Sequence, residues 1–557
     1  MFMKDFFDLK LRRAIWVSFL KEENIKDGID YFEKYISSLN DLCINENLKK
    51  DLNSEILLSK KIFVSFLNSL SDQLYQSKKY TEALICLVNC YKYKKDDIDI
   101  IEKIIVCMEN CQQKDLEAAL YEKLEILSKD NINAYKTLSK LYESCNDTNK
   151  AIKYYEKYYI AKSKNLNADE LNLYGCLYNK LYNEKYNIED AFKSLEFFQK
   201  ALEIDKLNDI IIKNAIIMSG LTNNVKLEKQ LWKIYMANFE LSNDDKFDYA
   251  AFCLKNSDFE NWYKYFDARF QKENNATIFP KLPAPLWHGT EDIKNSTLLI
   301  HYEQGFGDTF WITGYIERLK SKAKKIIYVV QDEVADLIRS SNLGVEVYGT
   351  NEINLEEIVY DYYIPAMSVP IALRLNKNNI SVGGGYIKPN NDIFLDMQDQ
   401  ICHSQNFKIG ICCSGSLEGD KTRNIDLENF LPLDDIDGIE IFSLDKQAMT
   451  EDFKIFKKHT INNVVFRFND FEQTAALIQN LDLVITTDNV ILNLAGAMGK
   501  KTFALFNWSY QFRWFDLSGE DVVYYNSVKP FVNKEMNNWS FSIKKIVDEI
   551  QKILRDI

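Results

Sequence analysis

The sequence predicts an N-terminal α-solenoid built from repeated helices, followed by two α/β lobes with parallel sheets. Three segments in the first half recur at a spacing of 34 residues, around Ala83, Glu117 and Ala151. In the second half, two successive series of short apolar strands alternate with helical stretches, which is typical of parallel sheets. At 557 residues the chain is too long for a single hydrophobic core.

The composition is that of an ordinary globular protein, with 46% apolar and 27% charged residues. The net charge of −13 argues against nucleic acid or an anionic membrane surface as the main partner. The first residues, MFMKDFFDLKLRR, carry charges where a signal peptide has an apolar segment. No apolar run reaches the roughly 18 residues that span a bilayer. We therefore expect a cytoplasmic protein with no transmembrane segment, whose cysteines are reduced thiols.

A spacing of 34 residues is the period of tetratricopeptide repeats, in which each repeat is a pair of packed helices. Between Ile25 and Phe270 the sequence has no proline and, before Gly175, only Gly28, which suits continuous helices. The best-fitting repeat runs from Ile132 to Tyr159. Its expected packing residues are Leu138, Ser139, Tyr142, Ala151, Tyr155 and Tyr158. Such an array presents a concave surface that suits an extended partner.

Four cysteines in the repeat region have metal-ligand-like spacing. The pairs Cys86/Cys90 and Cys107/Cys111 each lie four residues apart on neighbouring expected helices. A four-cysteine metal site is one interpretation, and small apolar side chains packing a helical core are the other. We favour packing and expect no metal site.

The proline-containing stretch 279–289 marks the end of the helical half. We expect a helical repeat domain over residues 1–270, a linker over 271–295, a first Rossmann-like lobe over 296–400 and a second over 401–557 with a closing helix. Expected strands are 297–302, 325–331, 345–349, 361–368, 408–415, 438–444, 462–468, 482–487 and 501–506. Expected helices are 309–319, 333–341, 470–480, 489–499 and 542–557.

The opening unit of the first lobe is a strand, a glycine-containing turn and a helix between Ser296 and Lys322. Gly305 and Gly307 lie within this turn, close to Gln304. We expect them to let the chain bend sharply and to let a ligand approach the backbone closely. Asp308 follows them at the mouth of a crevice formed by the strand ends. It is either a helix N-cap or a carboxylate that accepts a proton from a bound hydroxyl group.

Polar residues also follow three strands of the second lobe, where a phosphorylated ligand is expected. The free N–H groups at the start of the 489–499 helix favour an anion there. An equally good interpretation of Asp488 by itself is a helix N-cap. The alternative for Lys421 and Arg423 is that they are solvated surface charges. The candidate ligand-binding residues are Ser414, Ser416, Lys421, Arg423, Ser443, Thr487, Asp488, Asn489 and Asn493.

Other catalytic arrangements are missing from the sequence. It contains no P-loop, no HExxH motif and no recognisable Ser/His/Asp triad. Its four histidines leave little material for a histidine metal site. We expect neither a metal nor a bound cofactor.

Several stretches together resemble a known family. The segment STLLIHYEQGFGDTFWITGYIERLK, with 361–373, 410–427, 441–446 and 471–505, resembles bacterial tetratricopeptide-repeat proteins fused to a heptosyltransferase-like glycosyltransferase, of the lipopolysaccharide heptosyltransferase family. The resemblance implies a two-lobed fold of the GT-B type, with the acceptor on the first lobe and a nucleotide-sugar on the second. It implies inversion at the anomeric carbon without a metal ion.

The same resemblance assigns roles to individual residues. Asp308 matches the family's candidate base, Lys421 and Arg423 its basic positions, and Asp488 its aspartate at the donor helix. The family pattern D-T-x-x-x-H becomes Asp488, Asn489 and Asn493 here, and a D-W-R-W motif becomes 511–514 (QFRW).

We therefore expect a hexosyl- or heptosyltransferase that moves a sugar from a nucleotide-sugar donor to an acceptor. A protein acceptor, held partly by the repeats, suits a repeat array better than a small glycan does. The competing hypothesis is a non-catalytic repeat scaffold with a degenerate glycosyltransferase module, which the two asparagines favour.

Overall fold

The computed structural model describes residues 25–42, 49–110, 120, 123–124, 126–127, 132–273, 277, 279–415, 421–446, 452–465, 468–515, 517 and 522–556. These residues are mostly helical, and their strands form two parallel sheets. The chain divides into two compact units, Met1–Leu181 and Tyr182–Ile557. Within the described residues, no helix combines the length and the apolar character needed to cross a membrane. The predicted domain boundaries stay predictions.

The first unit is helical. Its described helices are α2 (Ile25–Leu42), α3 (Lys49–Gln76), α4 (Tyr80–Tyr93), α5 (Ile98–Asn110), α7 (Ile132–Ser144), α8 (Thr148–Ala161) and the start of α9 (Ala168–Lys185). The helices α7 and α8 confirm the helix pair predicted at 132–159, and its six predicted packing residues are all buried. The Ser139 hydroxyl donates a hydrogen bond of 2.7 Å to the Ala151 carbonyl, so the two helices cross closely where the sequence has small residues.

Three cysteines of the first unit lie in its hydrophobic core. Cys86, Cys90 and Cys107 are part of one apolar cluster with residues of α2 to α5, as the packing interpretation expects. Burial raises the pKa of the Cys86 and Cys90 thiols to about 12, which keeps both protonated near neutral pH. Cys111 and the repeat segment around Glu117 lie outside the described residues.

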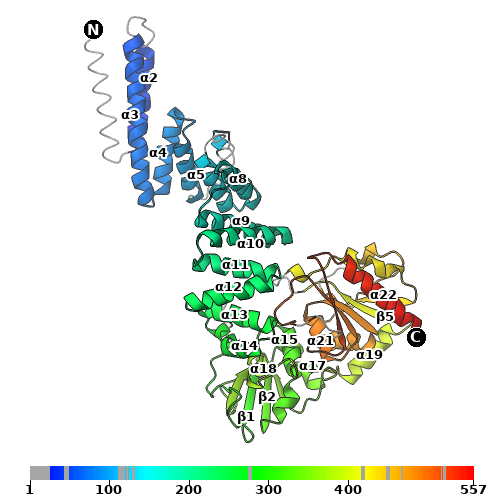
Figure 1. Cartoon of the computed structure of the whole chain (residues 1–557). Coiled ribbons are helices and arrows are strands. Elements are labelled where there is room, and N and C mark those ends of the chain that lie inside the picture. The colour runs from blue at the N-terminus through cyan, green and yellow to red at the C-terminus, as the bar shows by residue number, and fades with distance from the viewer. Residues whose placement is uncertain are drawn as a thin grey trace. The chain divides into compact units, whose positions relative to one another are not determined.

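Helices continue into the second unit. They are the end of α9, then α10 (Ile188–Ile204), α11 (Asp209–Leu221), α12 (Val225–Asn238), α13 (Asn243–Lys255), α14 (Phe259–Tyr265) and the 3₁₀ turn η2 (Phe266–Phe270). Figure 1 shows α10 to α14 as a stack of successive helices. Side-chain oxygens of Asn187, Asn208, Asn224, Ser242 and Asp258 cap the N-termini of α10 to α14 in turn.

The first sheet is parallel, with the strand order β3-β2-β1-β4. Its strands are β1 (Thr297–His301), β2 (Lys325–Val330), β3 (Glu346–Gly349) and β4 (Tyr362–Pro365). Around them lie α15 (Phe306–Thr313), α16 (Ile316–Lys320), α17 (Asp332–Ser340), η3 (Thr350–Glu352), η4 (Ala366–Ser368), α18 (Val369–Ala372) and α19 (Asn391–Ile401). The proline-containing stretch 279–289 lies beside β4, where Leu286 bridges to Tyr363.

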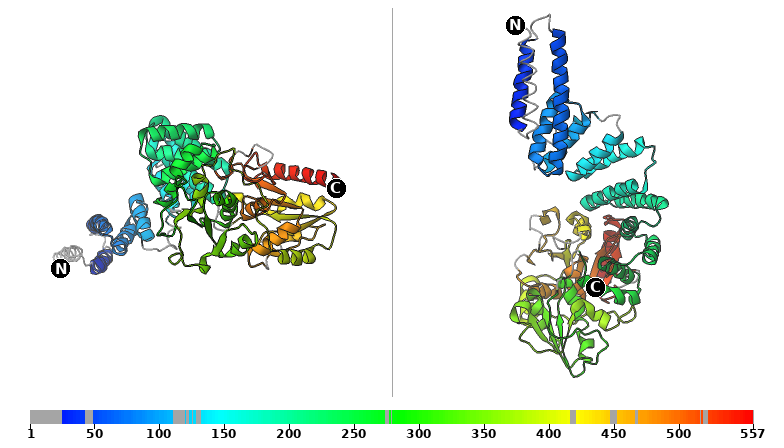
Figure 2. Two further views of the ribbon diagram at one scale, coloured as in Figure 1. Left: turned by 90° about the horizontal axis from the view of Figure 1, so that it is seen from below. Right: turned by 90° about the vertical axis from the view of Figure 1, so that its left-hand side faces the viewer.

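The second sheet is also parallel, with the order β6-β5-β7-β8-β9. Its strands are β5 (Phe407–Cys412), β6 (Ile439–Ser443), β7 (Leu483–Thr487), β8 (Thr502–Phe506) and β9 (Val528–Val532). The accompanying helices are η5 (Lys421–Arg423), η6 (Leu427–Asp435), η7 (Asp452–Ile455), α20 (Phe471–Asn480), α21 (Val490–Ala497) and α22 (Ser540–Asp556). Figure 2 shows α22 beside this sheet, at the C-terminal end of the chain.

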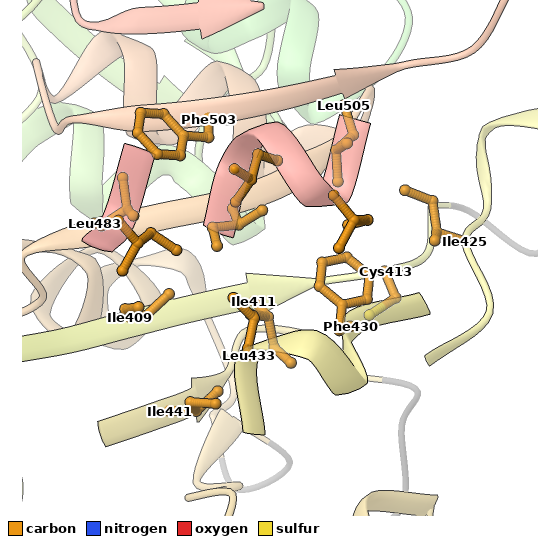
Figure 3. Close-up of a cluster of buried hydrophobic side chains, with 14 of the residues drawn as sticks. Ile409, Ile411, Cys413, Ile425, Phe430, Leu433, Ile441, Leu483, Phe503 and Leu505 are labelled. Atoms are coloured by element: carbon orange, nitrogen blue, oxygen red, sulfur yellow. The ribbon is translucent and has the colours of Figure 1, made fainter. Parts of the chain in front are cut away.

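A cluster of apolar side chains covers one face of the second sheet, and the residues of β7 and β8 are buried on the other face as well. Figure 3 shows Ile409 and Ile411 of β5 close to Leu483 of β7 and Phe503 of β8. These four side chains are at most 2% exposed. A strand buried on both faces reads as a continuous apolar run, which is why the sequence located β5, β7 and β8 correctly.

Three secondary-structure predictions were wrong or incomplete. The helix expected at 309–319 begins at Phe306 and breaks into α15 and α16 at Gly314, where a Cβ would lie 2.6 Å from Val382. The described residues of 462–468 make one bridge, from Asn462 to Phe442, and no strand. The strand β9 was missed because it contains Pro530, which argues against a strand in the sequence but is tolerated on an edge strand.

A buried ion pair joins η2 to the first lobe. The Arg269 guanidinium donates two hydrogen bonds to the Glu303 carboxylate, at 2.6 and 2.9 Å, and a third of 2.7 Å to the Ser368 hydroxyl. The side chains of Arg269 and Glu303 are 1% and 0% exposed. Glu303 is the first residue of the EQGFGD stretch, so the last turn of the helical segment holds this loop in place.

We expect Arg269→Met to lower the free energy of unfolding of the second unit by about 3–5 kcal/mol, because it leaves the Glu303 carboxylate buried without its cation. Thermal and urea unfolding of the full chain measures this loss. The double variant Arg269→Met/Glu303→Gln removes both charges and is expected to recover most of it. A single variant as stable as the double one would contradict this account of the pair.

Candidate functional site

Residues of both lobes line a cavity of about 760 Å³. Most of the residues that line it from the first lobe follow β1, with Glu333 after β2, and most of those from the second lobe follow β5, β6 and β7. In both sheets the strand order reverses beside the first strand, between β1 and β4 and between β5 and β7. Ligands of parallel α/β sheets bind in the crevice at this reversal, so the topology marks this cavity as the candidate site.

On the first-lobe side, the loop after β1 is strained at Gln304. Its φ is +65°, in the left-handed region that non-glycine residues rarely adopt. The Gln331 side chain, at the end of β2, donates a 3.1 Å hydrogen bond to the Gln304 carbonyl and accepts one of 2.7 Å from the Thr309 hydroxyl. The neighbouring strand therefore fixes this loop.

The glycines of the loop do not make the sharp turn that was predicted for them, and close approach of a ligand to them stays a prediction. Neither Gly305 nor Gly307 has a positive φ, so Gln304 makes the sharp turn. At Gly307 a Cβ would lie 3.0 Å from Nδ2 of Asn493, on the other side of the cavity. Gly307 thus lets α15 of the first lobe and α21 of the second approach each other closely.

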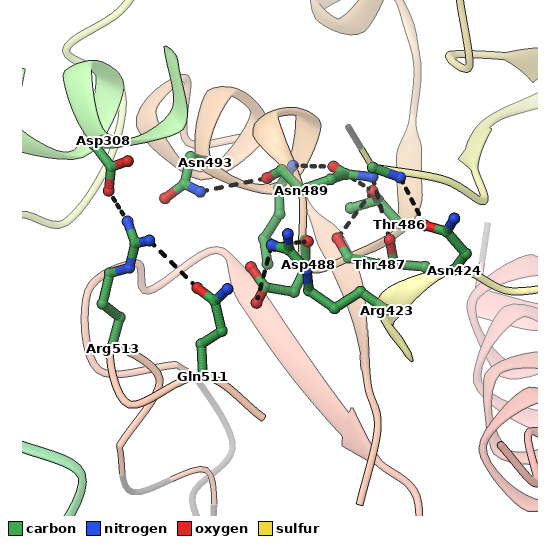
Figure 4. Close-up of polar contacts among 12 residues, drawn as sticks. Asp308, Arg423, Asn424, Thr486, Thr487, Asp488, Asn489, Asn493, Gln511 and Arg513 are labelled. Carbon is green, nitrogen blue, oxygen red and sulfur yellow. Dashed lines mark hydrogen bonds and ion pairs between the residues drawn. The ribbon is translucent and has the colours of Figure 1, made fainter. Parts of the chain in front are cut away.

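Asp308 is the third residue of α15, not the residue before the helix. One carboxylate oxygen, Oδ2, accepts a 3.2 Å hydrogen bond from the Gly305 N–H, as in a capping box. The other, Oδ1, makes an ion pair with the Arg513 guanidinium of the second lobe. Asp308 is 8% exposed, and Figure 4 shows its carboxylate turned toward Arg513.

On the second-lobe side, Asn489 is the N-cap of α21. Its Oδ1 accepts hydrogen bonds from the N–H groups of Ile491 and Leu492, at 2.9 and 3.2 Å. Its Nδ2 donates to the Ser414 carbonyl at 2.9 Å, which joins the ends of β5 and β7. The residue that departs from the resembled D-T-x-x-x-H pattern therefore performs the capping role for which threonine is also suited.

Because Asn489 caps the helix, the Asp488 side chain is not the cap and faces Arg423. The Arg423 guanidinium donates a 3.1 Å hydrogen bond to the Asp488 carbonyl and lies 3.8 Å from its carboxylate. Arg423 is part-buried, so it is not a solvated surface charge. Both side chains line the cavity, on the side away from Asp308 in Figure 4.

Asn493 lies on α21, between the Asp308–Arg513 pair and Asp488 in Figure 4. Its Oδ1 accepts a 3.0 Å hydrogen bond from the Tyr525 hydroxyl, and its Nδ2 donates to the Asn489 carbonyl at 3.3 Å. The Asn493 amide therefore lines the cavity and is also hydrogen-bonded to Tyr525 and Asn489.

The structure brings most of the predicted site residues to the cavity. Those that line it are Gln304, Gly305, Gly307, Asp308, Ser414, Arg423, Asp488, Asn489 and Asn493. Ser443 and Thr487 do not line it. Both are 0% exposed, and their hydroxyl oxygens accept hydrogen bonds from the Asp445 N–H and the Asn489 amide. Ser416 lies outside the described residues, and of Lys421 only its place in η5 is described.

Several cavity residues are absent from the predicted site, among them Asp445 and Arg513, the latter named only within the QFRW motif. Asp445 follows β6 and accepts a 2.5 Å hydrogen bond from the Ser414 hydroxyl. The rule that selected the residues after β5 and β7, a polar residue at the end of a parallel strand, would also have found it. Arg513 lies seven residues after β8, so strand-end position does not signal it.

The charge of the lining residues is mixed. Its carboxylates are Asp308, Glu333, Asp445, Asp470 and Asp488, and its basic side chains are Arg423, Lys446 and Arg513. Both arginines contact carboxylates of the site. No histidine is among the described lining residues. Within the described part of the chain, no group of three or more His, Cys, Asp or Glu residues has an arrangement that would hold a metal ion.

Comparisons with known proteins give distant likenesses only. No family model matches the chain, and no curated protein matches it in sequence. A family 9 glycosyl transferase from Veillonella parvula is 12% identical with a TM-score of 0.37, and the match covers 48% of this chain and 100% of that one.

Two further solved structures match parts of this chain. MamA from Desulfovibrio magneticus is 15% identical with a TM-score of 0.27, over 31% of this chain and 92% of that one. PilF from Pseudomonas aeruginosa is 10% identical with a TM-score of 0.30, over 38% and 92%. These TM-scores are too low to establish a shared fold.

We expect Asn489→Ala to lower the free energy of unfolding by about 1–3 kcal/mol, because α21 loses its cap and the Ser414 carbonyl loses a buried donor. Asn424→Ala is the matched control: Asn424 is exposed and accepts one 3.0 Å hydrogen bond, from the Gly415 N–H. Thermal unfolding compares the two. Equal, small losses would mean that the Asn489 amide has no structural role.

Proposed function

We propose that the chain is a glycosyltransferase that moves a sugar from a nucleotide-sugar to an acceptor hydroxyl group in this cavity. The observation that carries the proposal is the position of Asp308. Its carboxylate projects from the first lobe into a cavity whose opposite wall holds Arg423 and the start of α21. The EQGFGD and strand-end motifs that resemble the heptosyltransferase-like family lie at the same cavity, which supports a two-lobed arrangement of the GT-B type.

In this proposal the second lobe holds the donor phosphate. Arg423 supplies positive charge, and the N-terminus of α21 contributes its dipole. The donor's sugar then lies between Arg423 and Asp308. We propose that these groups meet the negative charge of the phosphate without a metal ion, and that no cofactor other than the nucleotide-sugar substrate takes part.

The transfer step follows from this placement. The acceptor hydroxyl gives its proton to Asp308 while its oxygen attacks the anomeric carbon from the face opposite the phosphate. The bond from that carbon to the phosphate oxygen breaks, and its electron pair leaves with the nucleotide. Attack from the opposite face inverts the anomeric carbon, which makes the enzyme an inverting hexosyl- or heptosyltransferase.

We propose that the acceptor is a protein, held partly by the helical repeats. The pair α7–α8 and the 34-residue spacing support tetratricopeptide repeats, and an α-solenoid of such repeats presents a surface suited to extended chains. The proposal keeps the bacterial, cytoplasmic setting expected from the sequence.

One observation favours the scaffold hypothesis instead. The Asn489 side chain accepts two of the N–H groups at the start of α21, which would otherwise be donors for a phosphate. A degenerate module that no longer binds nucleotide fits this arrangement. A calorimetric panel of nucleotides and nucleotide-sugars separates the two, because a scaffold without a donor site binds none of them.

We expect Asp308→Asn to reduce sugar transfer by about 10²–10⁴-fold while the donor nucleotide still binds, because the amide cannot accept the acceptor's proton. The measurement is turnover with the donor that the panel selects, together with calorimetry on the same preparation. Asp470→Asn, which removes a cavity carboxylate at the N-cap of α20 and keeps a side-chain oxygen for the cap, is the matched control. Near-normal transfer by the Asp308 variant would mean that this residue only caps α15.

We expect removal of residues 1–181, one whole compact unit, to abolish transfer to a protein acceptor while donor hydrolysis by water persists. The shortened chain keeps α10 to η2, because Arg269 of η2 supports the Glu303 loop. Mass spectrometry of the acceptor and release of free sugar are the two readouts. Undiminished protein modification by the shortened chain would contradict an acceptor role for the first unit.

A further inference from the structure

The ion pair between Asp308 and Arg513 uses the carboxylate that the proposed function needs as a base. A carboxylate bound to a guanidinium is a poor proton acceptor, because accepting the proton would discard a charge-assisted hydrogen bond. The guanidinium of Arg513 must therefore leave the Asp308 carboxylate before this carboxylate can act as a base. Some other group must then bind the guanidinium.

The backbone of Arg513 is firmly held. Its carbonyl accepts a 2.7 Å hydrogen bond from the Tyr524 hydroxyl. The rings of the flanking Phe512 and Phe515 pack edge-on against Phe247 of α13 and Phe259 of α14. The exchange therefore needs movement of the long side chain only, while Tyr524, α13 and α14 hold the backbone around it.

Arg513 lines the cavity, and its side chain is 24% exposed. Besides Asp308, it donates a 3.3 Å hydrogen bond to the Gln511 side chain, which lies on the same loop. Figure 4 shows Arg513 beneath Asp308, with Asn493 between this pair and Asp488. The space between Asp308 and Arg423, where the proposed function puts the donor, is thus flanked by a guanidinium on each side.

We propose that Arg513 is a second phosphate-binding residue, and that its guanidinium exchanges Asp308 for the donor's diphosphate when the donor binds. This inference rests on the proposed function of the cavity. A diphosphate carries more negative charge than one carboxylate and offers the same bidentate geometry, so it competes well for the arginine. Donor binding frees Asp308 in the same event, and the base becomes available only when a donor is present.

The alternative is a static brace, in which the pair simply holds the two lobes together. The two models predict opposite effects of removing the Asp308 charge. In the exchange model Asp308 competes with phosphate, so its loss strengthens phosphate binding. In the brace model its loss loosens the cavity, so phosphate binding is unchanged or weaker.

The experiment measures binding of inorganic pyrophosphate to the full chain by calorimetry, with UDP, ADP and GDP as further probes. We expect Asp308→Asn to tighten pyrophosphate binding at least about fivefold and Arg513→Ala to weaken it about 10- to 100-fold. In the Arg513→Ala background, Asp308→Asn should bring no gain. In an Arg423→Ala background, where overall affinity is also lower, the gain should remain.

Two controls separate exchange from a general charge effect and from misfolding. Glu333→Gln removes one negative charge from the same cavity wall without touching Arg513, and it should shift the affinity by no more than about twofold. Arg513→Lys keeps the charge, so it should fold and bind pyrophosphate more tightly than Arg513→Ala, with the Asp308→Asn gain retained. Thermal unfolding of each variant accompanies the titrations.

Each result of these titrations either supports the exchange or contradicts it. An Asp308→Asn variant with unchanged or weaker binding, or a gain that persists in Arg513→Ala, overturns the exchange and leaves the proposed function intact. If nucleotides bind with an affinity that does not depend on Arg513, the exchange is also overturned and the proposed function is kept. If the wild-type chain binds none of the four probes, the proposed function fails and the exchange fails with it.

Discussion

The candidate site depends on the buried ion pair of Arg269 and Glu303. A guanidinium and a carboxylate that are almost completely buried are stable only when they satisfy each other, so the two segments that carry them cannot separate without a large loss of free energy. One segment is the end of the helical stack, and the other begins the loop that carries Asp308. The position of the proposed base is therefore set by a residue of the helical half, 39 positions earlier in the chain.

The same helices also position the other wall of the cavity. Phe247 and Phe259 of α13 and α14 pack against Phe512 and Phe515, on either side of Arg513. Both members of the Asp308–Arg513 pair are thus held, through their loops, by residues 247–269. This explains why Tyr182–Ile557 forms one compact unit instead of dividing where the helices end.

Much of the fold could be predicted because it depends on local pattern. Fully buried strands such as β5 and β7 are continuous apolar runs, and polar residues after them mark the crevice of a parallel sheet. That rule located Ser414, Asp488 and Asn489 at the cavity. It failed for Ser443 and Thr487, whose hydroxyls satisfy neighbouring polar groups in the interior, because a strand end does not reveal which way a side chain points.

The sequence by itself determined the helical repeats, the two parallel sheets and the segments that form the crevice, because hydrophobic periodicity and strand ends are local properties. Only the tertiary structure decided that Gln304 makes the sharp turn, that Asn489 caps α21, and that Arg513 pairs with Asp308 across the cavity. These contacts join residues that are distant in the chain or depend on backbone geometry. Their partners are chosen by packing of the two lobes and the helices, and no spacing along the sequence encodes that choice.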